Sequence, residues 1–181
     1  GLCLVGSEMC IRDRIMTDKL ILEKIDNTAK ITINNPSANT WDLESLSRLE
    51  EIIGLLNKDD EIFSLVITGQ GEKFFSAGAD LKVFHEGGKD AAKEMSNAFS
   101  KAFEALSRFR GVSIAAINGF AMGGGLECAL ACDIRVAEEK AILALPEPKV
   151  GLLPCGGGTQ ILPRLVGEGL SLIHISEPTR Q

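Results

Sequence analysis

The sequence has no tyrosine, one tryptophan and two histidines, and its charge is predominantly negative. Binding of nucleic acid needs a basic surface, and a chain of 181 residues with a formal net charge of -6 does not indicate one. No apolar run is long enough to span a membrane. We therefore expect neither nucleic acid nor a membrane as a partner, whereas a local site for an anionic ligand is compatible with this charge.

Cysteine and histidine are too scattered to indicate a metal site or a disulfide framework. The five cysteines form no C-x-x-C pair. Cys128 and Cys132 are four residues apart, a spacing that would suit a metal on a helix, but His85 and His174 are both remote from them. Small buried apolar side chains are the favoured interpretation. We predict reduced cysteines, no metal and a cytoplasmic location.

Nucleotide-binding motifs are also absent. No G-x-x-x-x-G-K-[ST] sequence occurs, and Cys128 stands where a dinucleotide fingerprint beginning at Gly123 would need glycine or alanine. The glycines at 123–125 therefore need another explanation. The simplest is a tight turn between a strand and a helix; the alternative is a site at which the backbone approaches a ligand closely.

Glu127 favours the second explanation. It lies in the stretch from Leu126 to Cys132, which is otherwise apolar, and a helix that is apolar all round is a buried helix. A lone buried carboxylate is strongly unfavourable unless it is paired or protonated. Such an acid directly after three glycines indicates a catalytic site rather than packing.

Short β-type runs alternate with helical patterns, which predicts an α/β architecture with covered sheets. Strands are expected at 20–25, 30–33, 64–68, 74–76, 112–117, 134–137 and 141–145. Helices are expected at 41–57, 91–109, 126–132 and 159–166, the last weakened by Pro163. The pattern stops after Val166-Gly167, and no further helix is expected.

The two ends have no periodicity of either kind. Residues 1–15 and 170–181 resemble translated adapter DNA flanking a partial gene, so we expect two non-native tails around a domain of residues 16–169. A targeting peptide is the alternative at the N-terminus, but Glu8 and Asp13 interrupt it. On this interpretation His174 carries no functional weight.

Three motifs, in this order, resemble the crotonase, or enoyl-CoA hydratase/isomerase, family. They are Phe75-Ser76-Ala77-Gly78-Ala79-Asp80-Leu81-Lys82, the segment Asn118 to Glu127 with its three glycines, and the segment Pro146 to Gln160. Each motif alone is modest evidence, and the three together are specific. The resemblance covers roughly residues 16–169. It implies a spiral of ββα units with packed sheets, lacking the C-terminal helical region of the family.

The resemblance implies chemistry on acyl-CoA thioesters that passes through an enolate. The backbone N–H groups of Ala79 and Gly124 would form the oxyanion hole. Independently, a helix beginning near Gly124 would favour an anion there. Glu127 would activate water, and Glu147 would supply the proton to the α-carbon. Alone, Glu147 between two prolines would be taken for a solvated loop residue, but its separation from Glu127 matches the hydratases.

The resemblance also implies contacts with the substrate by Ala38, Ala77, Ala79, Asp80, Leu81, Lys82 and Gly124. Lys82 would meet an acidic group of CoA or be an ordinary surface lysine. Asp80 is better explained as a helix cap. Asn39 either lies near CoA or makes a turn.

Three further residues carry separate expectations. Trp41 is expected to pack, and His85 to be exposed at a helix end. Cys155 stands where many relatives carry glycine. It is expected to narrow the pocket near the catalytic water, which leaves the preferred acyl chain open.

The predicted function is that of an enoyl-CoA hydratase of short- or medium-chain acyl-CoA metabolism. Coenzyme A is part of the substrate, and no metal or redox cofactor is implied. Two alternatives stay open: a Δ3-Δ2-enoyl-CoA isomerase, because one carboxylate can shuttle a proton, and a non-catalytic fragment that binds acyl-CoA. Full-length relatives are expected to be homotrimers or hexamers.

Overall fold

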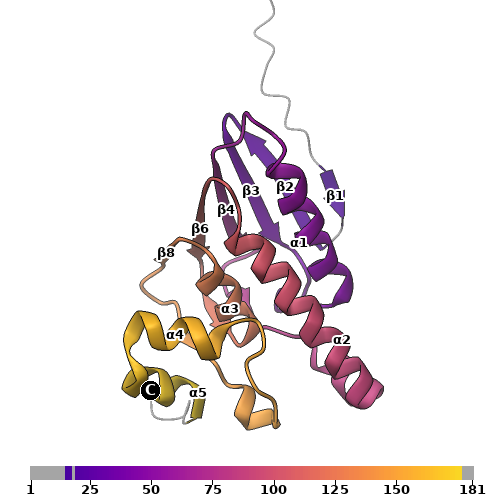
Figure 1. Cartoon of the computed structure of the whole chain (residues 1–181), viewed down its shortest axis with the longest axis vertical. Coiled ribbons are helices and arrows are strands. Elements are labelled where there is room, and N and C mark those ends of the chain that lie inside the picture. The colour runs from indigo at the N-terminus through magenta and orange to yellow at the C-terminus, as the bar shows by residue number, and fades with distance from the viewer. Residues whose placement is uncertain (1–14, 18, 177–181) are drawn as a thin grey trace, which may run out of the picture.

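The computed structural model describes residues 15–17 and 19–176, which form two sheets and the helices around them (Figure 1). The larger sheet has the strand order β1-β2-β3-β4-β6-β8. Its strands are β1 (Ile15–Thr17), β2 (Leu20–Ile25), β3 (Thr28–Ile33), β4 (Ser64–Gly69), β6 (Val112–Ile117) and β8 (Ile134–Ala137). The pairs among β1, β2 and β3 are antiparallel, and the pairs from β3 to β8 are parallel.

The smaller sheet is parallel and has the order β5-β7-β9. Its strands are β5 (Phe74–Ser76), β7 (Phe120–Met122) and β9 (Leu143–Ala144). The helices are α1 (Leu43–Leu56), α2 (Leu81–Ser107), α3 (Gly124–Ala131), the 3-10 helix η1 (Glu147–Val150), α4 (Gly158–Val166) and α5 (Glu168–Ser176).

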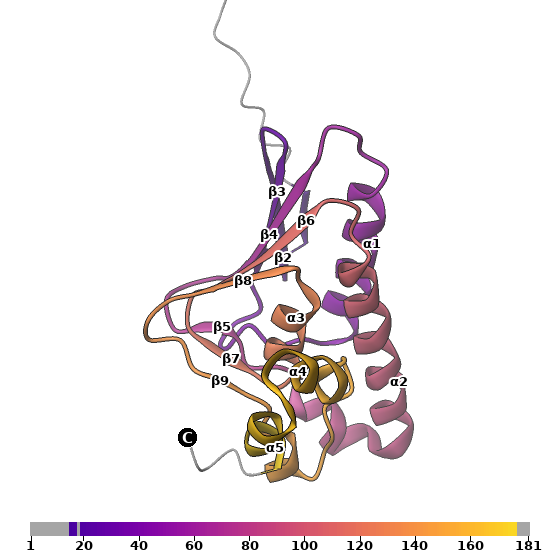
Figure 2. The same cartoon turned by 60° about the vertical axis from the view of Figure 1, so that its left-hand side comes forward.

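The order of the elements repeats a unit of two strands and one helix. The units are β4-β5-α2, β6-β7-α3 and β8-β9 followed by η1 and α4. In each unit the first strand joins the larger sheet and the second joins the smaller one. The predicted spiral of ββα units with packed sheets is therefore confirmed. Helices α1 and α2 cover one face of the larger sheet (Figures 1 and 2).

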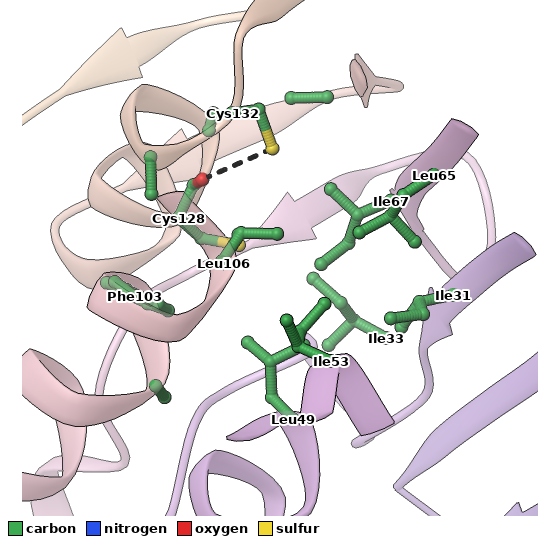
Figure 3. Packing of buried hydrophobic residues seen from close by; sticks show 14 of the residues in the cluster. Ile31, Ile33, Leu49, Ile53, Leu65, Ile67, Phe103, Leu106, Cys128 and Cys132 are labelled. Atoms are coloured by element: carbon green, nitrogen blue, oxygen red, sulfur yellow. Dashed lines mark hydrogen bonds between the residues drawn. The ribbon is translucent and has the colours of Figure 1, made fainter. Parts of the chain in front are cut away.

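Alternation along the strands builds the core between the larger sheet and α1. In β4, Leu65 and Ile67 are fully buried, whereas Ser64, Val66 and Thr68, which alternate with them, are only half-buried. Ile31 pairs with Ile67 in the neighbouring strand, and Leu49 and Ile53 of α1 lie on the same side (Figure 3). Burying each of these side chains stabilises the fold by about 1.5 to 3 kcal/mol before the entropy of ordering is subtracted.

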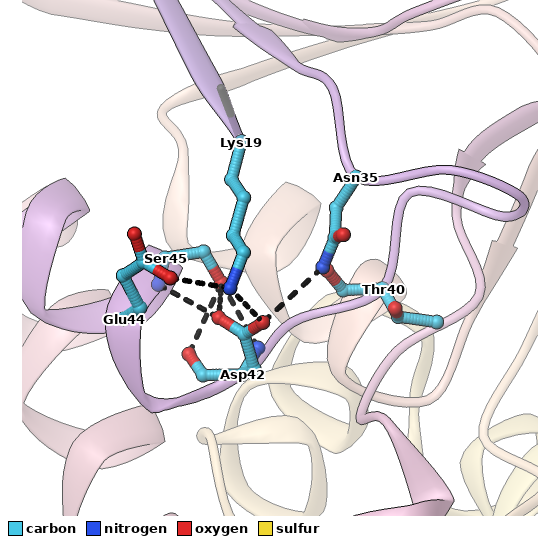
Figure 4. A network of polar contacts seen from close by, with 6 residues as sticks. All are labelled: Lys19, Asn35, Thr40, Asp42, Glu44 and Ser45. Atoms are coloured by element: carbon cyan, nitrogen blue, oxygen red, sulfur yellow. Dashed lines mark hydrogen bonds and ion pairs between the residues drawn. The ribbon is translucent and has the colours of Figure 1, made fainter. Parts of the chain in front are cut away.

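A polar network fixes the loop that leads into α1 (Figure 4). The ammonium of Lys19 lies 2.7 Å from Oδ2 of Asp42. Asp42 caps the helix, because its Oδ1 accepts a hydrogen bond from the backbone N–H of Ser45 at 2.9 Å. The side chain of Asn35 donates to the carbonyl of Thr40 at 2.8 Å. The loop before α1 is therefore tied to the start of β2 and to itself.

One expected helix begins elsewhere in the structure, and one strand was not expected, in both cases because of glycine. Helix α2 begins at Leu81 rather than at residue 91, since Asp80 caps its start, and a break at Gly88 (φ 62°, ψ -149°) hides the continuity. Strand β7 (Phe120–Met122) was not expected, because its three residues lie between Gly119 and Gly123 and are too short to show alternation.

The expectation that no helix follows Val166-Gly167 is wrong. Gly167, with φ of 83°, ends α4, and α5 begins at the next residue. Ser171 of α5 is buried, while Leu170 and Leu172 are exposed, so the apolar residues give no one-sided helical pattern. The assignment of residues 170–181 as a non-native tail stays a prediction. The corresponding expectation for residues 1–14 lies outside the described residues.

Candidate active site

A cavity of about 790 Å³ brings together the four residues expected to perform the chemistry. Ala79, Gly124, Glu127 and Glu147 all line it, although they come from three separate segments of the chain: Ala79 precedes α2, Gly124 and Glu127 lie in α3, and Glu147 begins η1. The rest of its wall is mostly apolar, with side chains from α2 and from the segment 150–155. A concave, largely apolar pocket with a few converging polar groups is typical of a small-molecule site.

Glu127 is an almost completely buried acid on the first turn of α3. It is 2% exposed, and every residue of this helix is buried. Its Oε1 accepts hydrogen bonds from the backbone N–H groups of Gly156 and Gly158, each at 2.8 Å. Burial raises the pKa of the carboxyl, and these amide donors oppose the rise without cancelling it. Backbone groups of the segment 155–158, that of Cys155 included, thus hold the acid in place.

Both positions that hold Glu127 leave little space for a side chain. A β-carbon at Gly156 would lie 2.9 Å from Oε2 of Glu127, and one at Gly158 would lie 3.0 Å from Oε1. No role for these two glycines was expected from the sequence. Their signal was the run Gly156-Gly157-Gly158, which belongs to the third motif, but nothing in the run indicates which acid it faces.

Glu147 is a second, half-buried acid on the same wall. It begins η1 directly after β9 and Pro146, and its side chain is half-buried rather than solvated. Within the described part of the chain, its Oε2 is buried without a hydrogen-bond partner. Burial raises the pKa of Glu147 to about 7, and the negative charge of Glu127 adds to the increase. The alternative of a solvated loop glutamate does not fit this burial.

The glycines at 123–125 let the start of α3 approach other parts of the chain. A β-carbon at Gly125 would lie 2.1 Å from the carbonyl oxygen of Ser76, and one at Gly124 would lie 2.6 Å from Cε1 of Phe99. Gly123 has φ of 54°, a conformation that residues with a side chain rarely adopt. These glycines are therefore needed for close packing, beyond making a turn.

The same packing brings the segment of Ala79 to the start of α3. A β-carbon at Gly78, whose φ is 87°, would lie 2.7 Å from the carbonyl of Met122 and 3.0 Å from the backbone nitrogen of Gly124. Ala79 follows directly in sequence. The backbone around Ala79 and the first amide of α3 thus lie side by side on the cavity wall.

Within the described part of the chain, neither of these two amides donates a hydrogen bond in the secondary structure next to it. Trp41 and Ala79 form a parallel bridge, in which the N–H of Trp41 donates to Gly78 and the N–H of Asp80 donates to Trp41. The amide of Ala79 takes no part in that bridge. Gly124 is the first residue of α3, where N–H groups have no acceptor inside the helix.

The other residues expected to contact the substrate divide into two groups. Ala77 and Leu81 line the cavity. Ala38 lies behind it, accepting a hydrogen bond from Ala77 at 3.0 Å. Asp80 caps α2, because its Oδ1 accepts from the backbone N–H of Lys82 at 3.1 Å, and Lys82 is exposed. The cap is confirmed, and contact of the second group with substrate stays a prediction.

The remaining residues singled out in the sequence are mostly structural. Trp41 is fully buried, as expected. Asn39 adopts φ of 53°, and its side chain donates to two backbone carbonyls, which supports the turn interpretation. Cys128 and Cys132 are buried free thiols, and burial raises the pKa of both. The side chain of His85 lies outside the described part of the structure.

Cys155, which is expected to narrow the pocket, and Ser96, for which the sequence indicates no role, are two of the polar residues that line the cavity. Cys155 lines the cavity and is exposed, in contrast to the two buried cysteines. Ser96 lines it from α2, in a stretch that the sequence presents only as an amphipathic helix. Spacing along α2 indicates a packing face but not which residues border a cavity.

Neither a cluster of metal-binding side chains nor a membrane-spanning helix occurs among the described residues. Over 15–17 and 19–176, no three His, Cys, Asp or Glu side chains come together in a way that could hold a metal ion. In the same part of the chain, none of the helices combines the length and the apolar character needed to cross a membrane.

Comparison with known proteins gives a consistent result. The short-chain-enoyl-CoA hydratase of Clostridium acetobutylicum is 40% identical over 155 residues, which cover 85% of this chain and 59% of the relative. The crotonyl-CoA hydratase of Syntrophomonas wolfei is 39% identical over 155 residues, covering 85% and 60%. The chain thus spans about three fifths of the length of these curated relatives.

Solved structures agree. Pseudomonas aeruginosa DspI is 62% identical with a TM-score of 0.86, covering 94% of this chain and 68% of that one. The enoyl-CoA hydratase of Bacillus anthracis is 36% identical with a TM-score of 0.83, covering 87% and 62%. Residues 23–172 match the protein family described as "Enoyl-CoA hydratase/isomerase". The resemblance seen in the three motifs is therefore confirmed, and this chain belongs to the enoyl-CoA hydratase/isomerase family.

Proposed function

We propose that the protein hydrates 2-enoyl-CoA thioesters, adding water across the 2,3 double bond. One observation carries this proposal: Glu127 and Glu147 line a single cavity together with the amides of Ala79 and Gly124. Hydration needs all of these parts. An oxygen must be activated for attack at C3, a proton must reach C2, and the charge that develops on the thioester oxygen must be stabilised.

The amides of Ala79 and Gly124 would hold the thioester oxygen. The N-terminus of α3 carries a partial positive charge, which adds to the effect of the two donors as the enolate forms. Because the cavity is largely apolar, these donors are little screened by water. Loss of one such donor typically raises the barrier by about 3 kcal/mol.

The two carboxyls would act on opposite ends of the double bond. Glu127 accepts the hydrogen bonds of Gly156 and Gly158 through Oε1, and its Oε2 would take a proton from the attacking water while the new C–O bond forms at C3. Glu147, with a pKa raised to about 7, is substantially protonated near neutral pH and supplies the proton to C2. The net change is the addition of one water molecule to the substrate.

The remaining parts of the proposal concern partners. The substrate would bring its own coenzyme A, and the chemistry above uses no metal or redox cofactor. The three described cysteines are free, which supports the cytoplasm as the location. We propose a homotrimer or hexamer for the full-length protein, on the family resemblance alone.

A Δ3-Δ2-enoyl-CoA isomerase is the second candidate. Glu147 favours it, because an acid with a pKa of about 7 and an unpaired buried oxygen could shuttle a proton between two carbons by itself. Retention of Glu127, held firmly by two amides, favours hydration. An isomerase would have no use for a second acid positioned in this way.

The test follows the absorbance of the conjugated thioester. Crotonyl-CoA loses this absorbance on hydration, and 3-butenoyl-CoA gains it on isomerisation. Both substrates are given to the 181-residue chain and to a form extended by the C-terminal region of the Clostridium relative. Hydration by either form supports the proposal. Isomerisation alone would favour the second candidate, and binding of acyl-CoA without turnover in both forms would indicate a non-catalytic protein.

A further inference from the structure

Cys155 occupies a distinctive position on the wall of the cavity. Both carboxyls line this cavity with it. It directly precedes Gly156, whose amide lies 2.8 Å from Oε1 of Glu127. The backbone of Cys155 is therefore fixed against the acid that would activate water.

The thiol of Cys155 is held as a neutral group. Burial raises its pKa, and the charges of Glu127 and Glu147 raise it further, while a hydrogen bond with the side chain of Ser96 acts weakly in the opposite direction. Ser96 lines the same cavity from α2. A protonated thiol next to two acids is a poor nucleophile, so its role is one of size and shape.

The neighbours of Glu127 give Cys155 this role. The two residues that bind the carboxylate, Gly156 and Gly158, have no side chains, and a β-carbon at either would lie within 3.0 Å of the acid. Cys155, directly before these glycines, lines the cavity and has a side chain. It therefore borders the space in which a water molecule on Glu127 must meet carbon.

In hydration, that carbon is C3 of the enoyl group. A substrate with one substituent at C3 can direct its chain along the open cavity and leave the side facing Cys155 to hydrogen. A substrate with two substituents at C3 must place one of them against the thiol. In a close-packed site, one misplaced methyl group typically changes the specificity by about 10- to 200-fold.

We propose that Cys155 determines the substrate class, admitting 2-enoyl-CoA thioesters with a single substituent at C3 and discriminating against those with two. This inference rests on the proposed hydratase function. The inferred substrates are unbranched at C3. The discrimination is assigned to the side chain of Cys155, which can be substituted while Glu127, Glu147 and the residues of the two amides are kept.

The experiment compares kcat/KM for crotonyl-CoA and for 3-methylcrotonyl-CoA. The two substrates differ by one methyl group at C3, and their intrinsic difference in reactivity cancels when proteins are compared. Cys155→Gly and Cys155→Ala should increase the relative use of the branched substrate at least tenfold. Cys155→Val, which enlarges the wall, should decrease it. Cys132→Ala, a buried cysteine outside the cavity, is the matched control and should leave the ratio within twofold.

The outcomes separate this inference from the function on which it rests. If no form of the protein hydrates crotonyl-CoA, the proposed function fails. If crotonyl-CoA is hydrated but the ratio is the same in Cys155→Gly, Cys155→Ala and Cys155→Val, the role of Cys155 is overturned and the hydratase stands. Circular dichroism and thermal unfolding check that each variant is folded. Cys155→Gly and Cys155→Ala test for an increase in the use of the branched substrate, and Cys155→Val tests for a decrease.

Discussion

Gly123 and Glu147 lie against each other across the cavity wall: a β-carbon at Gly123 would lie 3.0 Å from Oε1 of Glu147. Gly123 also has φ of 54° and immediately precedes the first residue of α3. The same glycine thus sets the backbone for the amide of Gly124 and makes room for the second acid. Two parts of the proposed machinery depend on the absence of one side chain.

Gly123→Ala should therefore damage both stability and activity. A β-carbon in this conformation is strained and crowds the carboxyl, so we expect a loss of about 1 to 3 kcal/mol in the free energy of unfolding. Gly54→Ala is the matched control, because Gly54 lies in α1 with open space around it and should gain about 0.5 to 1 kcal/mol. Urea unfolding of both variants checks this. A Gly123→Ala variant as stable and active as the wild type would contradict the packing described here.

Glu127→Gln tests the acid that would activate water. Glutamine has nearly the same size and can still accept hydrogen bonds from Gly156 and Gly158, so the fold should be retained. It cannot take a proton from water, and we expect hydration of crotonyl-CoA to fall by about 10²- to 10⁴-fold. Turnover is measured alongside circular dichroism. Activity within tenfold of the wild type, in a folded variant, would remove Glu127 from the chemistry.

The pH dependence of hydration tests the role of Glu147. Its pKa is raised to about 7, and only the protonated carboxyl can deliver a proton to C2. We therefore expect kcat/KM for crotonyl-CoA to decline as the pH rises through about 7, because this parameter reports groups of the free enzyme. Profiles recorded from pH 5 to 9 give the result. A constant value across pH 6 to 8 would argue against Glu147 as the proton donor.

The same raised pKa predicts how stability changes with pH. An unfolded glutamate loses its proton near pH 4.5, whereas folded Glu147 keeps it up to about pH 7. The unfolded state therefore binds fewer protons between these values, and stability contributed by the neutral acid is lost as the pH rises through this interval. Above pH 7 the loss is complete and no longer changes.

Glu147→Gln should remove this loss. We expect the variant to be more stable than the wild type by about 1 to 2 kcal/mol at pH 8, a value reduced from the full effect because the side chain is partly exposed. At pH 4 the two proteins should differ little. Urea unfolding at both pH values is the measurement, with the exposed Glu72→Gln as control. Equal stability of Glu147→Gln and the wild type at pH 8 would indicate that Glu147 is not held in its neutral form.

Much of the fold is encoded locally and could be predicted. The predicted bounds of the strands Leu20–Ile25 and Phe74–Ser76 are confirmed. Short runs of β-branched, aliphatic and aromatic residues bounded by turn residues are recognisable as strands from the sequence alone. Elements interrupted by glycine could not be placed in this way. The start of α2 depends on the cap at Asp80, and the three residues of β7 depend on pairing with β5 and β9, which are distant in sequence.

The candidate site divides along the same line. Glu127 could be identified from the sequence, because a carboxylate inside an apolar helix is anomalous on local grounds alone. Glu147 needed the family resemblance, because its burial arises from segments that meet only in the folded chain. Gly156 and Gly158 lie about thirty residues from Glu127 in the sequence, so their role as hydrogen-bond donors to this acid arises only in the folded chain. The same holds for the position of Cys155 in the cavity that both acids line.

A crystal structure with butanoyl-CoA, a saturated analogue that cannot be hydrated, tests the central claim most directly. The thioester oxygen should lie about 2.7 to 3.1 Å from the backbone nitrogens of both Ala79 and Gly124. C2 and C3 should then lie within reach of the carboxyls of Glu147 and Glu127. A bound thioester whose oxygen contacts neither amide, or whose C3 lies away from Glu127, would contradict the account.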